Sequence, residues 1–133
     1  MFSFFTTKEA NKVLPDIIKK FEYALSKNNE VRKIEQKLQV SVSTTNSFED
    51  YVTLKQSLNS AIIKFYESVE ILESTGVVVK SLEQGLLDFP SKRFDEEVCL
   101  CWKHGETEIK FWHEKDSGFM GRKPIEVSDE TLV

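Results

Sequence analysis

The spacing of the apolar residues changes once along this chain, near residue 76, and this change limits the possible fold more than any other feature. Before Gly76, apolar residues recur every three or four positions over two long stretches, as they do in amphipathic helices. After it, short β-branched or aromatic runs are separated by Gly, Pro, Ser or Asp. The pattern predicts an α+β fold, in which a long antiparallel helical hairpin over 1–75 is followed by a small antiparallel sheet packed on it.

The first helix has a clear start signal. Thr6 and Glu9 form a capping box, in which each side chain accepts a hydrogen bond from the other residue's backbone amide, and Phe5 is placed as a hydrophobic staple. A helix should therefore begin at about Thr7. Pro15 interrupts the apolar pattern early, and it either kinks this helix or starts a second segment.

The sequence also indicates where the two helices are connected. The polar run 41–47 has little to bury and is rich in turn-forming residues, so it should join them. Asn46 with Glu49 is predicted to cap the second helix, and Gly76 stands where a left-handed residue would end it. Two helices of some thirty residues each with a short loop form an antiparallel hairpin.

The second half of the chain is predicted to form a four-stranded antiparallel meander. Its strands are expected at Val77–Lys80, Leu86–Phe89, Val98–Trp102 and Glu108–Trp112. Alternation along the strands assigns one set of residues to a face that packs on the helices: Val98, Leu100, Trp102, Ile109 and Phe111. It assigns Cys99, Cys101, Lys110 and Trp112 to the other face. Because that face includes a large aromatic, either the segment from Glu114 onward or a partner should cover it.

Length and composition favour one soluble domain. The chain of 133 residues is 40% hydrophobic and 30% charged, and no apolar run approaches a membrane span. We expect a single domain over 1–133, made of the hairpin (1–75), the sheet (76–113) and a C-terminal loop and tail (114–133). Two cysteines are too few for a disulfide framework, and the opening residues do not read as a signal peptide. A cytoplasmic location follows as the expectation.

Charge and surplus apolar surface make predictions about partners. Residues 1–75 carry ten basic and ten acidic side chains, and residues 76–133 carry eight and twelve. Because neither half has the basic excess that displaces counterions from phosphate, nucleic acid is an unlikely partner. The long helices offer more apolar surface than the rest of the chain can cover, so a homodimer is expected.

Residues capable of chemistry concentrate in the segment Gly85–Pro124, which holds both tryptophans, both histidines and both cysteines. A zinc site can be drawn from the ligand types Cys99, Cys101, His104, Glu106, His113 and Glu114. The two cysteines alternate along one strand, however, whereas zinc thiolates usually come from tighter turns. A divalent ion held by His113 with Glu106 is the other metal hypothesis.

Two further residues have both a structural and a functional interpretation. His113 needs a polar partner, and Asp88 or Glu106 could fix its tautomer, either as a structural contact or as part of a site. Arg122 lies in a glycine-rich turn where it could hold an anion. Alternatively, Arg122 forms a salt bridge with Asp88, Asp95 or Glu106 and fixes the tail.

Motifs spread over most of the chain resemble one protein family. They are Glu9–Pro15, Gly76-Val77, Gly85–Pro90, Leu100–Trp102, Gly105-Glu106, Ile109, Trp112-His113, Gly118-Phe119 and Gly121-Arg122 with Pro124. The chain is similar to a family of small uncharacterised bacterial and archaeal proteins known as domain of unknown function 2203, which has no assigned activity. The resemblance implies that a set of residues belongs to the family's pattern: Asp88, Cys101, Trp102, Glu106, Trp112, His113 and Arg122. Cys99 and His104 lie outside that pattern, which weakens the two-cysteine zinc site.

Two functions follow as hypotheses. The first is a non-enzymatic binding or self-assembly module, since the chain holds no complete nucleophile or phosphate-cradling motif. The second is a protein that binds a small molecule, with an anion as one option, or a divalent metal, and that could be a metal-assisted hydrolase. Its ligand-binding residues would be Asp88, Trp102, Glu106, Trp112, His113 and Arg122.

Overall fold

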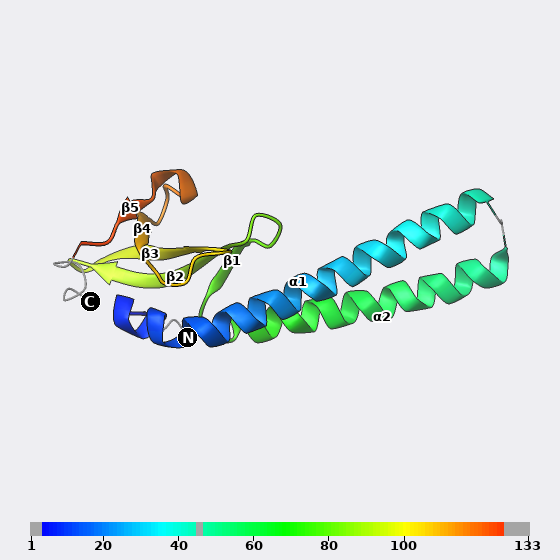
Figure 1. Ribbon diagram of the computed structural model, residues 1–133, viewed down its shortest axis with the longest axis horizontal. Helices are drawn as coiled ribbons and strands as arrows, with labels where there is room; N and C mark the ends of the chain where they lie inside the picture. The colour runs from blue at the N-terminus through cyan, green and yellow to red at the C-terminus, as the bar shows by residue number, and fades with distance from the viewer. Residues whose placement is uncertain (1–3, 45–46, 127–133) are drawn as a thin grey trace. The chain divides into compact units, whose positions relative to one another are not determined.

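The computed structural model describes residues 4–44 and 47–126 of the chain. Within them, two long helices are followed by an antiparallel sheet, so the predicted α+β class is confirmed (Figure 1). The chain divides into two compact units. One unit contains the middle of the hairpin, Lys20–Ile71, and the other joins the residues up to Lys19 with those from Leu72 onward.

The first helix, α1, spans Thr7–Thr44 and starts as predicted. The amide of Thr6 donates to Glu9 Oε1 at 3.0 Å, and the amide of Glu9 donates to Thr6 Oγ1 at 2.9 Å, which is the predicted capping box. The helix runs through Pro15 without a second segment. It also extends four residues into the predicted loop, because the Thr44 hydroxyl donates to the carbonyl of Val40 and so supports the last turn.

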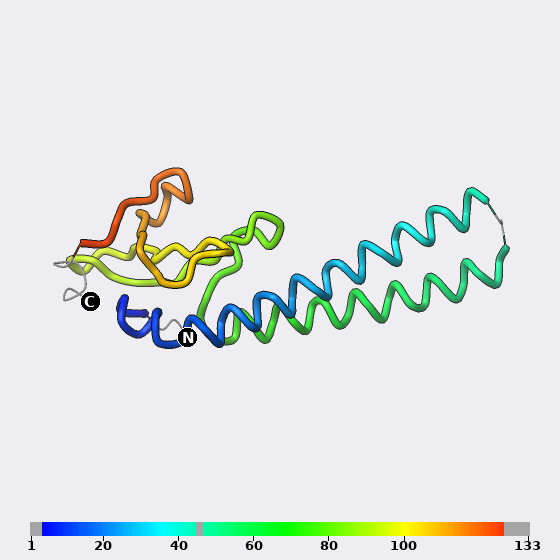
Figure 2. The backbone as a smooth tube through the Cα atoms, viewed as in Figure 1, coloured from blue at the N-terminus to red at the C-terminus, as the bar shows by residue number. Residues whose placement is uncertain are grey.

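The second helix, α2, spans Phe48–Glu73 and runs antiparallel to α1 (Figure 2). Ser47 caps it by accepting a hydrogen bond from the Asp50 amide at 3.3 Å, whereas the predicted cap Asn46 lies outside the described residues. Gly76 follows the helix with φ +102°, and its amide bonds to the carbonyl of Glu73. A glycine is therefore required there, as the sequence predicted.

The two helices pack through an apolar cluster within the hairpin unit. Val31, Leu58 and Ala61 are its buried centre, and its margin is half-buried: Ile34, Leu38, Ile62 and Phe65. None of the described helices has a stretch long and apolar enough to cross a membrane.

The sheet has five strands in the order β1-β2-β3-β4-β5, one more than predicted. They are β1 (Val78–Ser81), β2 (Leu86–Arg93), β3 (Glu96–Lys103), β4 (Phe111–Glu114) and β5 (Lys123–Pro124). The additional strand is β5, which pairs antiparallel with β4. It returns the segment after Glu114 to the edge of the sheet beside β4. The loop before β5 lies beside the second face, where Phe119 and Cys101 line one pocket.

The register of β4 differs by one residue from the prediction. Leu100 lies opposite Trp112 and Cys101 lies opposite Phe111, so Trp112 shares the buried face of Leu100. The predicted faces, with Phe111 inside and Trp112 outside, were therefore wrong. The physical cause is a contact between residues far apart in the chain: the Ile109 amide donates to the Asn11 side chain of α1 at 2.6 Å instead of joining the ladder, and the strand begins only at Phe111.

The start of the chain is bound into the sheet within the same unit. The Phe5 amide donates to the Pro90 carbonyl at 2.7 Å, and the Ser91 hydroxyl donates to the Phe5 carbonyl at 2.6 Å. The rings of Phe5 and Phe89 meet edge to face at 5.3 Å. The staple residue Phe5 thus contacts strand β2 as well as starting the helix.

Gly85→Ala is expected to lower the free energy of unfolding by about 1–3 kcal/mol. Gly85 has φ +71°, and a Cβ atom there would lie 2.5 Å from the Cβ of His104. Gly105→Ala is the matched control, because Gly105 also has a positive φ, +107°, but faces open space. Urea unfolding of both variants should show the larger loss for Gly85→Ala, and equal losses would contradict the steric contribution.

Candidate functional site

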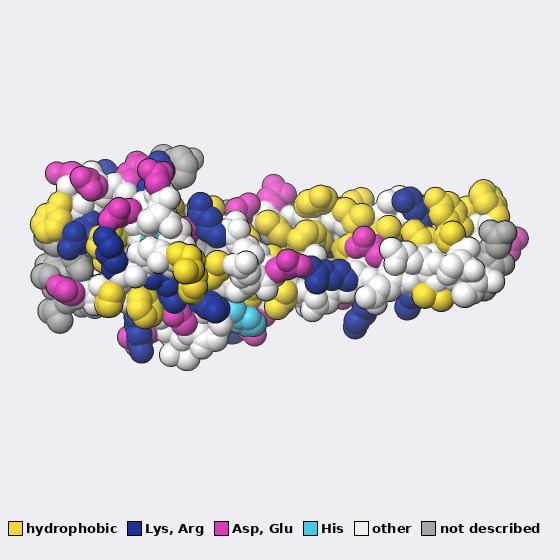
Figure 3. Space-filling view, turned by 90° about the horizontal axis from the view of Figure 1, so that it is seen from above, with side chains coloured by type: hydrophobic (Ala, Val, Ile, Leu, Met, Phe, Trp, Pro, Cys, Tyr) yellow, Lys and Arg dark blue, Asp and Glu magenta, His cyan; other side chains and the backbone are white. Residues whose placement is uncertain are grey.

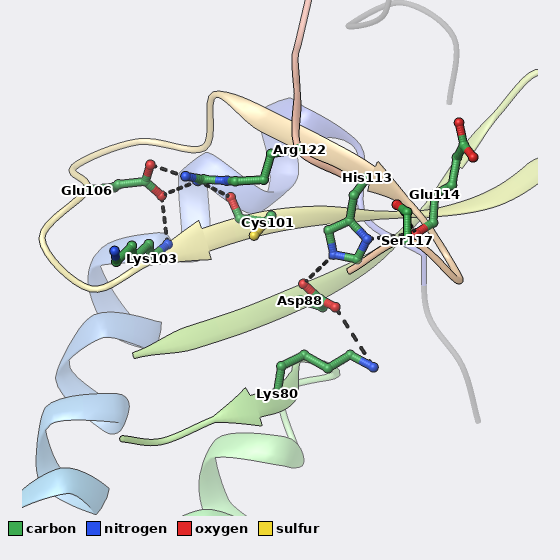
Figure 4. Close-up of polar contacts among 9 residues, drawn as sticks. All are labelled: Lys80, Asp88, Cys101, Lys103, Glu106, His113, Glu114, Ser117 and Arg122. Atoms are coloured by element: carbon green, nitrogen blue, oxygen red, sulfur yellow. Dashed lines mark hydrogen bonds and ion pairs between the residues drawn. The ribbon is translucent and has the colours of Figure 1, made fainter. Parts of the chain in front are cut away.

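Three side chains meet on the face of the sheet opposite to Leu100 and Trp102: Asp88 from β2, Cys101 from β3 and His113 from β4. Strand pairing brings them together. Asp88 lies directly opposite Cys101, and His113 lies directly opposite Cys99, which is two residues before Cys101 on the same face of β3. All three side chains are buried. Figure 4 shows them pointing toward one another across three neighbouring strands.

Asp88 and His113 form a buried pair, each with only 2% of its surface exposed. His113 Nε2 lies 2.9 Å from Asp88 Oδ1, and His113 Nδ1 lies 2.7 Å from the carbonyl oxygen of Glu114. The Glu114 carbonyl also accepts a hydrogen bond from the Ser117 hydroxyl. Both ring nitrogens therefore have an oxygen partner, and these two contacts fix the orientation of the ring.

The second oxygen of Asp88 is less well satisfied. Asp88 Oδ2 is buried and accepts no hydrogen bond from any described residue. Its nearest cation is the Lys80 ammonium, whose Nζ lies 4.0 Å away. Buried carboxylate oxygens normally accept hydrogen bonds, so this atom marks the place where a ligand or an ion could complete the site.

A pocket of about 250 Å³ opens over this group. Its lining joins the buried residues to the loop that follows β4, and it consists of Lys80, Leu86, Asp88, Cys101, His113, Lys115, Asp116, Gly118 and Phe119. The two lysines bring positive charge to a pocket that also contains two carboxylates. Lys115, Asp116, Gly118 and Phe119 belong to the connection between β4 and β5, so the pairing of β5 with β4 keeps them beside the sheet.

The two thiols are poor nucleophiles. Burial raises the pKa of Cys99 to about 11, with a further rise from the negative charge of Asp88. Burial also raises the pKa of Cys101 to about 11, although the Arg122 guanidinium partly offsets this effect. In the protein without metal, both cysteines therefore stay protonated near neutral pH.

Glu106 and Arg122 form a second, separate pair. Arg122 Nη2 donates to both carboxylate oxygens of Glu106, at 2.7 and 2.8 Å, and Glu106 Oε1 also accepts from the Lys103 amide. The guanidinium lies over the Phe111 ring at 4.1 Å from its centroid. This is the structural interpretation of Arg122: a salt bridge that fixes the C-terminal segment to the loop after β3.

Of the predicted site residues, the structure brings together Asp88 and His113, but it joins Glu106 to Arg122 instead. Trp102 is fully buried, and its indole N–H donates to the Glu106 carbonyl at 2.9 Å. Trp112 lies on the same buried face, with the Lys123 ammonium 5.0 Å from its ring centroid. Neither tryptophan lines the pocket over Asp88.

A search of the described residues for possible metal ligands finds one group, Asp88, Cys101 and His113. Of the metal ligands predicted from the sequence, His113 and Cys101 belong to this group. Cys99, His104, Glu106 and Glu114 do not. Asp88 was predicted as a partner of His113 and as a ligand-binding residue, but it was not among the residues named as metal ligands.

Residues 3–125 match the family described as "Uncharacterized conserved protein (DUF2203)". The chain belongs to the DUF2203 family. Comparisons with curated proteins and with solved structures gave no match. The function of this DUF2203 protein must therefore be argued from its own geometry.

The sequence of this DUF2203 protein contains a spacing that is compatible with the Asp88–Cys101–His113 group, but only the correct strand register shows that the three residues meet. Asp88, Cys101 and His113 are separated by thirteen and twelve positions, which fits neighbouring strands of a meander. In the predicted alternation His113 shares the face of Ile109 and Phe111, whereas the observed register places it on the face of Cys99 and Cys101. With the correct register, the three residues fall on one face.

Proposed function

We propose that the protein is a non-enzymatic binding protein whose ligand site is the pocket over the Asp88–His113 pair. The observation that carries the proposal is that Asp88, whose buried Oδ2 accepts no hydrogen bond from the described residues, lines a pocket of about 250 Å³. Pockets for drug-sized ligands begin at about 300 Å³. The size therefore suits a single ion or a molecule of a few atoms better than a nucleotide or a coenzyme.

The chemistry of the lining favours binding over catalysis. Both ring nitrogens of His113 are engaged, so the imidazole is not a free general base. The raised pKa values of the cysteines argue against thiolate attack. Metal-assisted hydrolysis is the alternative function, and it would depend on water bound to a metal ion at this site.

Lysine side chains at the mouth of the pocket favour a ligand with negative charge. The side chains of Lys80 and Lys115 are 53% and 67% exposed, and both line the pocket. Lys115 is held by Glu97 at 2.9 Å, which leaves Lys80 as the more available cation. A small oxyanion such as phosphate is the probe that this arrangement suggests.

Amide chemical shifts in a heteronuclear NMR titration test the binding site. Inorganic phosphate and zinc chloride, added separately, should shift amides that line the pocket, such as those of Leu86, Gly118 and Phe119. Lys80→Glu should weaken phosphate binding about tenfold, because it reverses a charge at the mouth. Lys110→Glu is the matched control, since Lys110 is exposed and lies outside the pocket. If neither probe shifts these amides, the proposal is wrong.

A second candidate function is self-assembly of two chains through α2. Helix α2 carries two stripes with heptad spacing. The first stripe packs on α1 through residues such as Leu58, Ala61 and Phe65. The second stripe is offset from it and consists of Phe48, Val52, Lys55, Asn59, Ile62, Tyr66 and Val69, of which Ile62 also lies at the margin of the cluster between the two helices.

Much of this second stripe is open to solvent. Phe48 is 77% exposed and Tyr66 is 67% exposed. Figure 3 shows hydrophobic side chains at the surface along the length of the hairpin. Soluble proteins rarely leave such stripes uncovered, so a further helix is expected to pack on them.

A second copy of the chain fits this surface. Around a two-fold axis at Asn59, an antiparallel pair of α2 helices would place Val52 against Tyr66. Asn59 would then meet its own copy, and a single buried asparagine is known to fix the register of paired helices. We therefore propose that the protein forms a homodimer through this stripe.

Light scattering at low micromolar concentration tests the dimer. The wild-type protein and Ser60→Glu should have the mass of two chains, because Ser60 lies on α2 away from the second stripe. Tyr66→Glu should have the mass of one chain, since it places a charge at the centre of the proposed contact. A monomeric wild-type protein would rule out this function.

A further inference from the structure

The atoms that meet at Asp88, Cys101 and His113 have the composition of a metal site. One carboxylate oxygen, the Cys101 Sγ and one ring nitrogen lie within 4.8 Å of one another, and all three residues are buried. Carboxylate, thiolate and imidazole are the three side-chain ligand types of protein-bound zinc. No two of these ligands are adjacent in the chain, and the strand pairing alone brings them together.

The surroundings of His113 are those of a metal-binding histidine. Its Nδ1 donates to the Glu114 carbonyl at 2.7 Å, which fixes the ring and directs Nε2 toward Asp88 (Figure 4). Histidines that bind metal usually donate their other N–H to a carbonyl or a carboxylate in this way. The contact therefore holds Nε2 in the position of a ligand.

The unsatisfied oxygen of Asp88 is an independent observation that points to a cation. Asp88 Oδ2 is buried and accepts no hydrogen bond from the described residues, and the Lys80 ammonium stays 4.0 Å away. A bound cation would satisfy the carboxylate directly. One carboxylate and one thiolate would also balance the charge of a divalent ion, so the buried complex would be neutral.

We propose that Asp88, Cys101 and His113 bind a divalent transition-metal ion, zinc by preference, with the fourth coordination position open to the pocket. The inference rests on the proposed function of this pocket as the binding site. Ligand atoms around tetrahedral zinc are roughly 3.5 Å apart. The pair at 2.9 Å must open by about half an ångström to admit the ion, which a small side-chain rotation provides.

The open position gives the site a further property. Structural zinc sites use four protein ligands, whereas sites with three ligands keep one position for water or a ligand. Here that position faces the pocket lined by Lys80 and Lys115. The metal and these lysines would together select a small oxyanion, which connects the metal to the ligand class proposed above.

Cobalt titration of the metal-free protein tests this inference without any activity assay. Co²⁺ should bind one per chain and produce the near-ultraviolet charge-transfer absorption of a cobalt–thiolate bond. Cys101→Ser should abolish this absorption and weaken zinc binding at least about tenfold. Cys99→Ser is the matched control, because Cys99 lies on the same strand and face but outside the ligand group, and it should keep the absorption.

X-ray absorption of the zinc-loaded wild-type protein provides a second measurement if Cys101→Ser does not fold. It should find one sulfur ligand at about 2.3 Å. A zinc site with only nitrogen and oxygen ligands, or cobalt absorption that survives in Cys101→Ser, would overturn the inference. If phosphate shifts the pocket amides while zinc and cobalt do not bind, the metal site alone is wrong and the proposed binding function stands.

Discussion

Asp88→Ala should lower the free energy of unfolding of the metal-free protein by about 1–3 kcal/mol, the cost of leaving a buried hydrogen-bonding group without its partner. The His113 ring is 2% exposed, and it would lose the carboxylate that lies 2.9 Å from its Nε2. No described residue offers a second acceptor to that nitrogen. Urea denaturation followed by tryptophan fluorescence measures the loss.

Two further measurements distinguish the stability contributed by the Asp88–His113 pair from that contributed by the residues around it. Lys80→Ala should cost less than about 1 kcal/mol, because the lysine is exposed and its ammonium is 4.0 Å from Asp88. In a double-mutant cycle, Asp88→Asn and His113→Gln should show a coupling energy of about 1–3 kcal/mol. Additive losses, or a loss below about 1 kcal/mol for Asp88→Ala, would show that the pair does not stabilise the fold.

Trp102→Ala should lower the free energy of unfolding by about 3–5 kcal/mol. The side chain is fully buried on the inner face of the sheet, and its removal would leave a large cavity beside Leu87, its partner on β2. The indole N–H also donates to the Glu106 carbonyl at 2.9 Å, so the loop after β3 would lose a contact. Thermal and urea unfolding monitored by circular dichroism provide the measurement.

Trp102→Phe distinguishes the packing from the hydrogen bond. It keeps most of the apolar volume and should cost about 1–3 kcal/mol, mainly for the unsatisfied Glu106 carbonyl and the smaller ring. Met120→Ala is the control for a large side chain that is 93% exposed, and it should change stability by less than about 0.5 kcal/mol. Similar losses for Trp102→Ala and Met120→Ala would contradict the assigned core.

Features of the fold that depend on neighbouring residues could be predicted from the sequence. The capping box of Thr6 and Glu9 and the left-handed Gly76 involve atoms three or four positions apart. Their geometry is set by local hydrogen bonds and backbone sterics. The change of period near residue 76 likewise separated the helices from the sheet.

Features that depend on distant residues were not predictable in the same way. The register of β4 follows from the bond between Ile109 and Asn11, which lie 98 positions apart. The same limit applied to Arg122, whose acidic partner the sequence left open and the structure identifies as Glu106. For the candidate site, the residue types were visible, but their grouping needed the register of three strands.

The bonds that join Phe5 to Pro90 and Ser91 have a consequence for the order of folding. The Ser91 hydroxyl and the Phe5 carbonyl are 86 positions apart, and closing so long a flexible loop carries a large entropic cost. The helical hairpin turns the chain back on itself through nearby contacts, and it thereby returns Leu72 to the unit that contains Lys19. Local contacts form faster than distant ones, so the paired helices should assemble early and the sheet should close onto the amino-terminal turn afterwards.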